Sequence, residues 1–171
     1  MDFTIRRGKL EDAGAIARVH VDSWRSTYAE ILSATFLASL STEARTESWQ
    51  RQIMAGTSVI FVAERQGGVV GFAAGGKSRQ AITGYDAELY AIYLLREEQV
   101  RGIGRALVNA LVDSLRDRGF VAMLVLVLEK NPAVSFYAHL GAAEIGRQSI
   151  EIGGMAVEEL IYAWPSLDGC C

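Results

Sequence analysis

Apolar residues in the first third of the chain are spaced first as in a β-strand and then as in α-helices. The opening segment alternates in polarity and predicts a short strand. Further on, apolar residues recur at every third or fourth position, and Asp12 and Ser41 stand where they can cap helices. The pattern therefore predicts one strand and three helices, at residues 3–7, 12–28, 34–40 and 42–54.

The rest of the chain alternates strand-like runs with helix-like spacing. Two apolar runs on either side of Gln66-Gly67-Gly68 predict a hairpin, and Gly153-Gly154 predicts a second one. Apolar positions after Gly102 line one face of a helix that Gly119 ends, and Pro132 begins a shorter helix. The expected strands lie at residues 59–64, 69–75, 88–95, 121–128, 147–152 and 155–164.

The order of these elements indicates an α+β fold. A chain of 171 residues, with no repeat and no linker, is about the length of one domain. We expect a single domain at residues 1–165, in which a mixed sheet of about seven strands is flanked by helices. Residues 166–171 are expected to form a C-terminal tail.

Composition narrows the possible functions. The net charge of −3 argues against nucleic-acid binding, and no apolar run approaches the roughly 20 residues that span a bilayer. No export signal is visible, so we expect a cytoplasmic protein that does not bind membranes. Cys170 and Cys171 are adjacent at the end of the chain and predict a reduced, disordered tail. The sequence suggests no metal site.

The segment from Gln99 to Arg105, between an expected strand and an expected helix, is suited to hold an anion. Gly102 and Gly104 permit a tight turn, and the first turn of a helix leaves backbone N–H groups free. Together with Arg101, Arg105 and the helix dipole, these groups favour a phosphate. The segment lacks the Gly-Lys-Ser/Thr of a Walker loop, although the glycines alone would also suit an ordinary turn.

Two motifs resemble those of the GCN5-related N-acetyltransferase (GNAT) superfamily, and the order of the expected elements is also similar to its fold. Gln99-x-x-Gly102-x-Gly104 resembles the loop that binds the pyrophosphate of acetyl-CoA in that family. Residues 131–141 resemble the family segment Asn-x-x-Ala-x-x-Phe-Tyr-x-x-Leu-Gly, which contacts the pantetheine arm. The register differs at one place, because the family asparagine falls on Lys130 and Asn131 follows it.

The resemblance implies that acetyl-CoA is the co-substrate. It also implies that the fourth strand parts from its neighbour and that its free edge binds pantetheine and the thioester oxygen. The positions implied to bind the coenzyme are Ile92, Tyr93, Leu94, Gln99, Val100, Arg101, Gly102, Ile103, Gly104, Arg105, Lys130, Asn131, Ala133 and Tyr137.

Acetylation of an amine requires a free base form of that amine and a protonated leaving thiol. An alkyl ammonium with a pKa near 10.4 costs about 4.6 kcal/mol to deprotonate at pH 7, so a base helps. Glu88 matches the position of a glutamate in the histone-acetylating branch and is our candidate; a strand-end carboxylate facing water remains the alternative. The substitutes are Asp86, Asp22 and His20.

Tyr137 is the candidate acid that protonates the departing thiolate. A phenol with a pKa near 10 transfers its proton to a thiolate whose conjugate acid is near 8.5 at a cost of about 2 kcal/mol. Without the family motif, Tyr137 would be interpreted as an aromatic residue packed beside Phe136. Trp24, Tyr28 and Tyr85 are candidates for the acceptor pocket, with core packing as the alternative.

These motifs favour an N-acetyltransferase that moves acetyl from acetyl-CoA to a primary amine of a small molecule or peptide, by direct attack in a ternary complex. Two alternatives remain open: a non-catalytic acyl-CoA sensor and a protein N-acetyltransferase of the ribosomal or histone type. A homodimer could form on the edge of the last hairpin.

Overall fold

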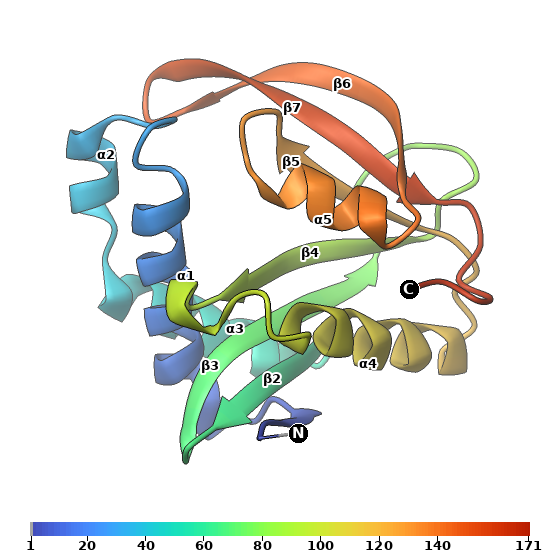
Figure 1. Ribbon diagram of the computed structural model, residues 1–171, viewed down its shortest axis with the longest axis horizontal. Coiled ribbons are helices and arrows are strands. Elements are labelled where there is room, and N and C mark those ends of the chain that lie inside the picture. The colour runs from blue at the N-terminus through green and yellow to red at the C-terminus, as the bar shows by residue number, and fades with distance from the viewer. Residues whose placement is uncertain (1) are drawn as a thin grey trace.

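The computed structural model describes residues 2–171. Its seven strands form one mixed sheet in the order β1-β2-β3-β4-β5-β7-β6 (Figure 1). The strands are β1 (Thr4–Arg7), β2 (Val59–Arg65), β3 (Gly68–Lys77), β4 (Ala87–Leu94), β5 (Met123–Leu128), β6 (Ala143–Ile152) and β7 (Met155–Trp164). Only β4 and β5 pair in parallel. The expected α+β class with a mixed sheet of about seven strands is confirmed.

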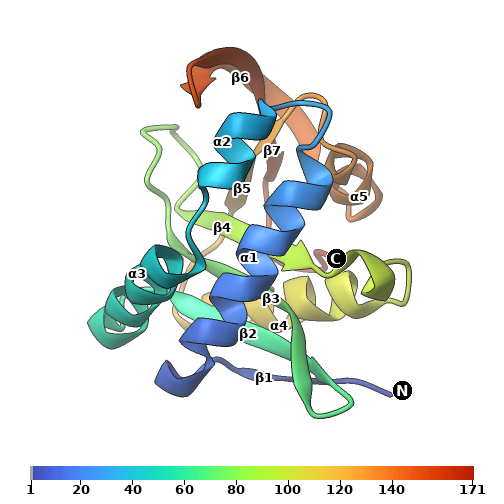
Figure 2. The same cartoon turned by 90° about the vertical axis from the view of Figure 1, so that its left-hand side faces the viewer.

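Five α-helices cover the two faces of this sheet (Figure 2). On one face, α1 and α3 pack on β2 and β3 through Ile16, Trp49 and Phe72. On the other face, α4 buries Leu107 and Leu111 against β2, β3 and β4. The helices are α1 (Ala13–Thr27), α2 (Ala34–Ser39), α3 (Thr42–Ala55), α4 (Ile103–Asp117) and α5 (Ala133–His139), with 3₁₀ turns η1 (Leu10–Asp12) and η2 (Arg96–Glu98).

The ends of two strands differ from the expected ones because of contacts that are distant in sequence. The backbone N–H groups of Val121 and Ala122 donate to the Asp86 carboxylate, so β5 begins only at Met123. Conversely, β6 begins at Ala143 because an irregularity after Glu144 lets this segment pair with β7.

The C-terminal tail is ordered, so the expectation of a reduced, disordered tail is wrong. Leu167 is 1% exposed within the main core, and its N–H donates to the carbonyl of Val121 at 2.8 Å. Cys170 and Cys171 pack against the same core and are joined by a disulfide. Burial of Leu167 therefore holds the last residues against the domain.

The outer edge of β6 has no strand partner within residues 2–171. A homodimer through this edge stays a prediction. None of the helices described is long and apolar enough to cross a membrane.

Candidate functional site

The parallel strands β4 and β5 separate in the middle of the sheet. Only three residue pairs join them, Ala87 with Met123, Glu88 with Leu124 and Leu89 with Val125. Beyond Leu89, β4 continues to Leu94 with β3 alone as a partner, and β5 diverges from it (Figure 1). The edge at Ile92, Tyr93 and Leu94 therefore faces a gap, which leaves backbone groups free to bind an extended ligand.

A loop rich in free backbone N–H groups leads from β4 into α4. Val100 has a φ of 60° and Gly102 a φ of 81°, so the chain turns sharply before the helix starts. In the part of the chain described, the N–H groups of residues 100–105 have no hydrogen-bond acceptor. The exposed Arg101 and Arg105 flank them. Successive free N–H groups at a helix N-terminus form a site for a phosphate.

The glycine loop and the second motif meet at Gly104. A Cβ atom at this position would lie 3.2 Å from the Phe136 ring of α5. A side chain at residue 104 would therefore require the Phe136 ring to move by a few tenths of an ångström, and glycine allows the close approach of α4 and α5. The two segments, which are distant in sequence, form one wall of the site.

Asn131, not Lys130, is built into this wall. Its Nδ2 donates to the Tyr28 hydroxyl at 3.1 Å, and its Oδ1 accepts from the N–H of Ala133 at 2.9 Å. Asn131 is buried, whereas Lys130 is exposed. The amide thus links α1 to the start of α5. Which of the two residues contacts the coenzyme stays a prediction.

Tyr137 lies in the core with its ring against Trp164. Burial raises the pKa of the Tyr137 phenol above its usual value, with a smaller contribution from Tyr28. Its hydroxyl has no hydrogen-bond partner within residues 2–171. In this state the proton transfer costs more than the roughly 2 kcal/mol expected for an ordinary phenol.

Two more tyrosines approach the same region. Burial raises the pKa values of Tyr28 and Tyr93, and their hydroxyl groups lie beside each other. All three phenols therefore remain protonated at neutral pH and can donate hydrogen bonds. The sequence identified Tyr93 for its backbone, and nothing in the local pattern pointed to its hydroxyl.

Glu88 is 1% exposed and is held by Arg79. Both the backbone N–H and the Nε of Arg79 donate to its carboxylate, at 3.1 and 2.9 Å. The guanidinium also lies 4.1 Å from the centre of the Tyr90 ring. The alternative of a carboxylate facing water is wrong, because Glu88 is buried in an ion pair. It must give up this partner to act as a base, and that role stays a prediction.

The other candidate residues are more dispersed. The Asp86 carboxylate accepts hydrogen bonds from the N–H groups of Val121 and Ala122, just before β5, and these bonds occupy it. Asp22 is exposed on α1, and Tyr85 is half-buried in the loop before β4. Trp24 packs edge-on against Tyr28 with ring centres 4.7 Å apart, so these two candidates for the acceptor pocket are adjacent.

His20 is a buried neutral side chain. Burial lowers the pKa of His20 to about 3, with a smaller effect of Arg45. Its Nδ1 accepts from the Trp49 indole N–H at 3.2 Å, and its ring stacks on Tyr93. A histidine with so low a pKa is a weak base, which argues against it as the proton acceptor for an ammonium group.

The low pKa of His20 predicts that acid destabilises the fold. His20 takes up a proton near pH 6.5 in the unfolded chain and only near pH 3 in the folded chain. The free energy of unfolding therefore has its full value above pH 6.5 and falls as the pH drops below 6.5. Between pH 7 and pH 5 we expect His20 to remove about 2 kcal/mol from the free energy of unfolding, measured with urea. His20→Gln, which can still accept from Trp49, abolishes this loss. His139→Gln retains it; equal losses in both variants would contradict the explanation.

The sequence matches the model of the acetyltransferase (GNAT) family over residues 21–142. It is also 42% identical to the uncharacterized N-acetyltransferase YuaI of Bacillus subtilis over 165 residues, which is 96% of this chain and 94% of that protein. The chain therefore belongs to the GNAT family of acetyltransferases, as the two motifs predicted.

Solved structures share the fold. YncA of Salmonella typhimurium, solved with acetyl-CoA, superimposes with a TM-score of 0.74 at 22% identity, covering 98% of this chain and 95% of that one. The PaiA N-acetyltransferase of Thermoplasma acidophilum, solved with coenzyme A, gives a TM-score of 0.71 at 21% identity, covering 94% and 98%. At these identities the similarity shows a common architecture.

Proposed function

We propose that this enzyme transfers the acetyl group of acetyl-CoA to the primary amine of a small molecule or peptide, by direct attack in a ternary complex. The observation that carries this proposal is the row of free N–H groups at residues 100–105, next to the gap between β4 and β5. Membership of the GNAT family and the coenzymes in the solved relatives support the choice of donor.

The chain offers a separate group for each part of the donor. The N–H groups of the glycine loop, with Arg101 and Arg105, suit the diphosphate. The free edge at Ile92 to Leu94 suits the amides of the pantetheine arm and the thioester oxygen, as an added strand would. The start of α5, at Ala133, completes the wall beside that arm.

The reaction forms a bond from the amine nitrogen to the acetyl carbon and breaks the bond from that carbon to sulfur. The ammonium first loses a proton, to Glu88 directly or through a water molecule, and Tyr137 donates to the departing sulfur. A covalent route through cysteine is not proposed, because the two cysteines of the sequence, Cys170 and Cys171, are adjacent at its C-terminal end. Direct attack requires no such group.

Removing the two loop cations is expected to weaken donor binding. Each charge-assisted contact is worth about 1 kcal/mol at an exposed site, so Arg101→Met with Arg105→Met raises the Kd for acetyl-CoA about 30-fold. Titration calorimetry at two salt concentrations measures this. Arg116→Met, at the opposite end of α4, is the control and keeps the wild-type Kd. An unchanged Kd in the double variant would contradict the phosphate site.

The function itself is tested by following thiol release from acetyl-CoA across amines, polyamines, amino acids, antibiotics and short peptides. Release that depends on one class of amine supports the proposal. Binding of acetyl-CoA without turnover on any amine would favour the sensor instead, and turnover on proteins alone would favour the protein N-acetyltransferase.

A further inference from the structure

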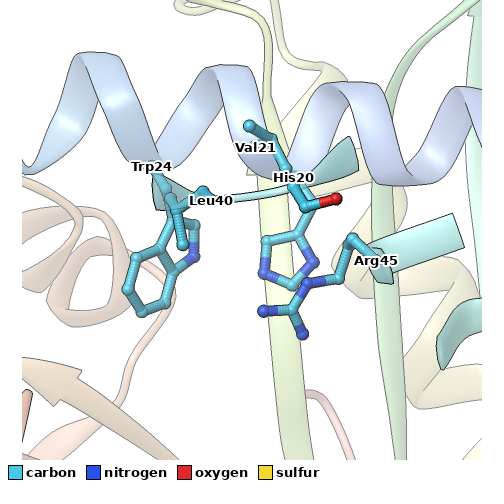
Figure 3. A pocket seen from close by; sticks show the side chains of 6 residues that line it. His20, Val21, Trp24, Leu40 and Arg45 are labelled. Atoms are coloured by element: carbon cyan, nitrogen blue, oxygen red, sulfur yellow. The ribbon is translucent and has the colours of Figure 1, made fainter. Parts of the chain in front are cut away.

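The pocket between α1 and α3 is too small to hold an acceptor (Figure 3). It is lined by His20, Trp24 and Arg45, among others, and its volume of about 20 Å³ has room for about one water molecule. The His20 ring stacks on Tyr93 with ring centres 5.1 Å apart, so packed rings separate the pocket from the gap in the sheet. Arg45 would also repel an ammonium group. The acceptor therefore needs a different binding surface.

One face of β5 and β7 offers such a surface beside the gap. Leu160 belongs to the core on the α4 side, so Ile161 faces the other way, since side chains alternate along a strand. Leu126 of β5 is paired directly with Ile161 and shares its face. Both residues are partly exposed, because α1 and α3 pack mainly on β2 and β3. Solvent therefore reaches a strip of apolar side chains along this face.

Glu159 lies at the end of this strip, on the same face as Ile161. It is paired with Leu128, the last residue of β5, and Leu128 packs against Tyr28 at the end of α1. Burial raises the pKa of the Tyr28 phenol, and the negative charge of Glu159 adds a smaller rise. The Tyr28 hydroxyl lies beside that of Tyr93 on β4. Glu159 is therefore close to the phenols that border the gap.

The Glu159 carboxylate forms no ion pair within residues 2–171. Its Oε1 accepts from Nε2 of Gln148 at 2.8 Å, and its Oε2 has no donor in the described chain. An ionised carboxylate offers about four acceptor sites, so most of this capacity is free. Glu88, by contrast, is held by the guanidinium of Arg79. Glu159 can therefore receive a cationic ligand without first losing a partner.

Glu159 and the candidate donor site lie on opposite faces of the sheet. The glycine loop and α5 are on the α4 side, and Glu159 is on the side of α1. Because β5 is the single strand between β7 and β4, Glu159 starts at least two strand spacings, roughly 10 Å, from the edge of β4. A short aliphatic chain with an ammonium group at each end spans most of this distance, and the Glu159 side chain covers the rest. Leu126 and Ile161 offer the methylene groups an apolar surface.

We propose that Glu159 binds a second positive charge of the acceptor, so that the preferred acceptors of this enzyme are small aliphatic diamines and polyamines. The proposal rests on the proposed function, because it assigns a subsite for the second substrate. Glu159 is then a specificity-determining residue that holds the ammonium group far from the reaction. The amine that is acetylated lies at the other end of the chain, in the gap.

The kinetic test compares cadaverine with pentylamine, which has the same carbon chain and one ammonium group fewer. We expect Glu159→Gln to raise KM about 10-fold for cadaverine and less than 2-fold for pentylamine, with the Kd for acetyl-CoA unchanged. Comparing each amine between two enzymes removes the difference in amine basicity. Equal effects on the two amines would overturn the proposal.

Glu158→Gln is the matched control, because it removes the same charge from the next residue of β7, which faces the α4 side. We expect it to leave KM unchanged for both amines. The amide oxygen in Glu159→Gln still accepts from Gln148, so urea denaturation should give the wild-type free energy of unfolding. An equal rise of KM for cadaverine in both variants would overturn the proposal, since it would reflect overall charge.

A second measurement does not depend on turnover. Cadaverine is titrated by calorimetry into the enzyme saturated with coenzyme A, which carries no acetyl group to transfer. We expect saturable binding that is about 10-fold weaker in Glu159→Gln and unchanged in Glu158→Gln. An equal Kd in Glu159→Gln and the wild type would overturn the subsite.

The two measurements also separate this proposal from the proposed function. Binding of cadaverine that depends on Glu159, without thiol release from acetyl-CoA on any amine, would support the subsite and reject the proposed function. Thiol release on pentylamine and cadaverine alike, with no effect of Glu159→Gln, would support the proposed function and reject the subsite.

Discussion

Tyr137→Phe is expected to lower kcat about 100-fold while acetyl-CoA binds as tightly as in the wild type. The phenol is buried and stays protonated, and in the proposed mechanism it donates to the leaving sulfur. Phenylalanine fills the same space against Trp164, and the hydroxyl has no partner in the described chain that its removal would leave unpaired. Steady-state thiol release gives kcat, and calorimetry gives the Kd.

The matched control for this experiment is Tyr162→Phe, which removes a hydroxyl from β7. We expect its kcat to equal that of the wild type. If Tyr137→Phe also retained full kcat, solvent rather than this phenol would protonate the thiolate. A loss of donor affinity in Tyr137→Phe would instead indicate a role in binding.

Arg79→Met is expected to lower the free energy of unfolding by about 2–3 kcal/mol at pH 7, because it leaves the buried Glu88 carboxylate without its cation. The backbone N–H of Arg79 still donates to Glu88, and Arg79 is itself half exposed, which keeps the loss at the lower end for a buried pair. Adding Glu88→Gln should restore stability to within about 1 kcal/mol, since the amide carries no charge. Urea denaturation of the four proteins measures this cycle.

The Glu88→Gln variant of this cycle also tests whether Glu88 has a structural role or a catalytic one. If Glu88 is the base, Glu88→Gln is stable and loses about 100-fold in kcat, with the loss greatest at low pH, where the amine is mostly protonated. A stable Glu88→Gln with wild-type kcat would mean that Glu88 serves only to hold Arg79. Failure of Glu88→Gln to rescue Arg79→Met would contradict the electrostatic explanation.

Local periodicity predicted most of the fold, because each strand and helix buries a face that its own residues encode. Its errors lie where contacts between residues distant in sequence determine the local structure. The start of β5 depends on Asp86, which is 36 residues from Ala122, and the order of the tail depends on Leu167 entering a core that other elements form. Neither contact leaves a pattern in the neighbouring sequence.

The features of the candidate site also differ in whether the sequence could predict them. The glycine loop is a local motif, so its free N–H groups could be anticipated from Gly102 and Gly104. The pairing of Glu88 with Arg79, and of Tyr28 with Asn131 across 103 residues, could not, because no spacing rule joins them.

The short pairing of β4 with β5, at three residue pairs, also affects the stability of the sheet. Among the described residues, strands β1 to β4 pair with strands β5 to β7 only at these three pairs, so the two halves of the sheet are joined along a short length. An amide-bearing ligand lying in the opening would act as a surrogate strand for β4. Occupancy would then strengthen the sheet itself, and resistance of the enzyme to heat would rise with the concentration of its donor.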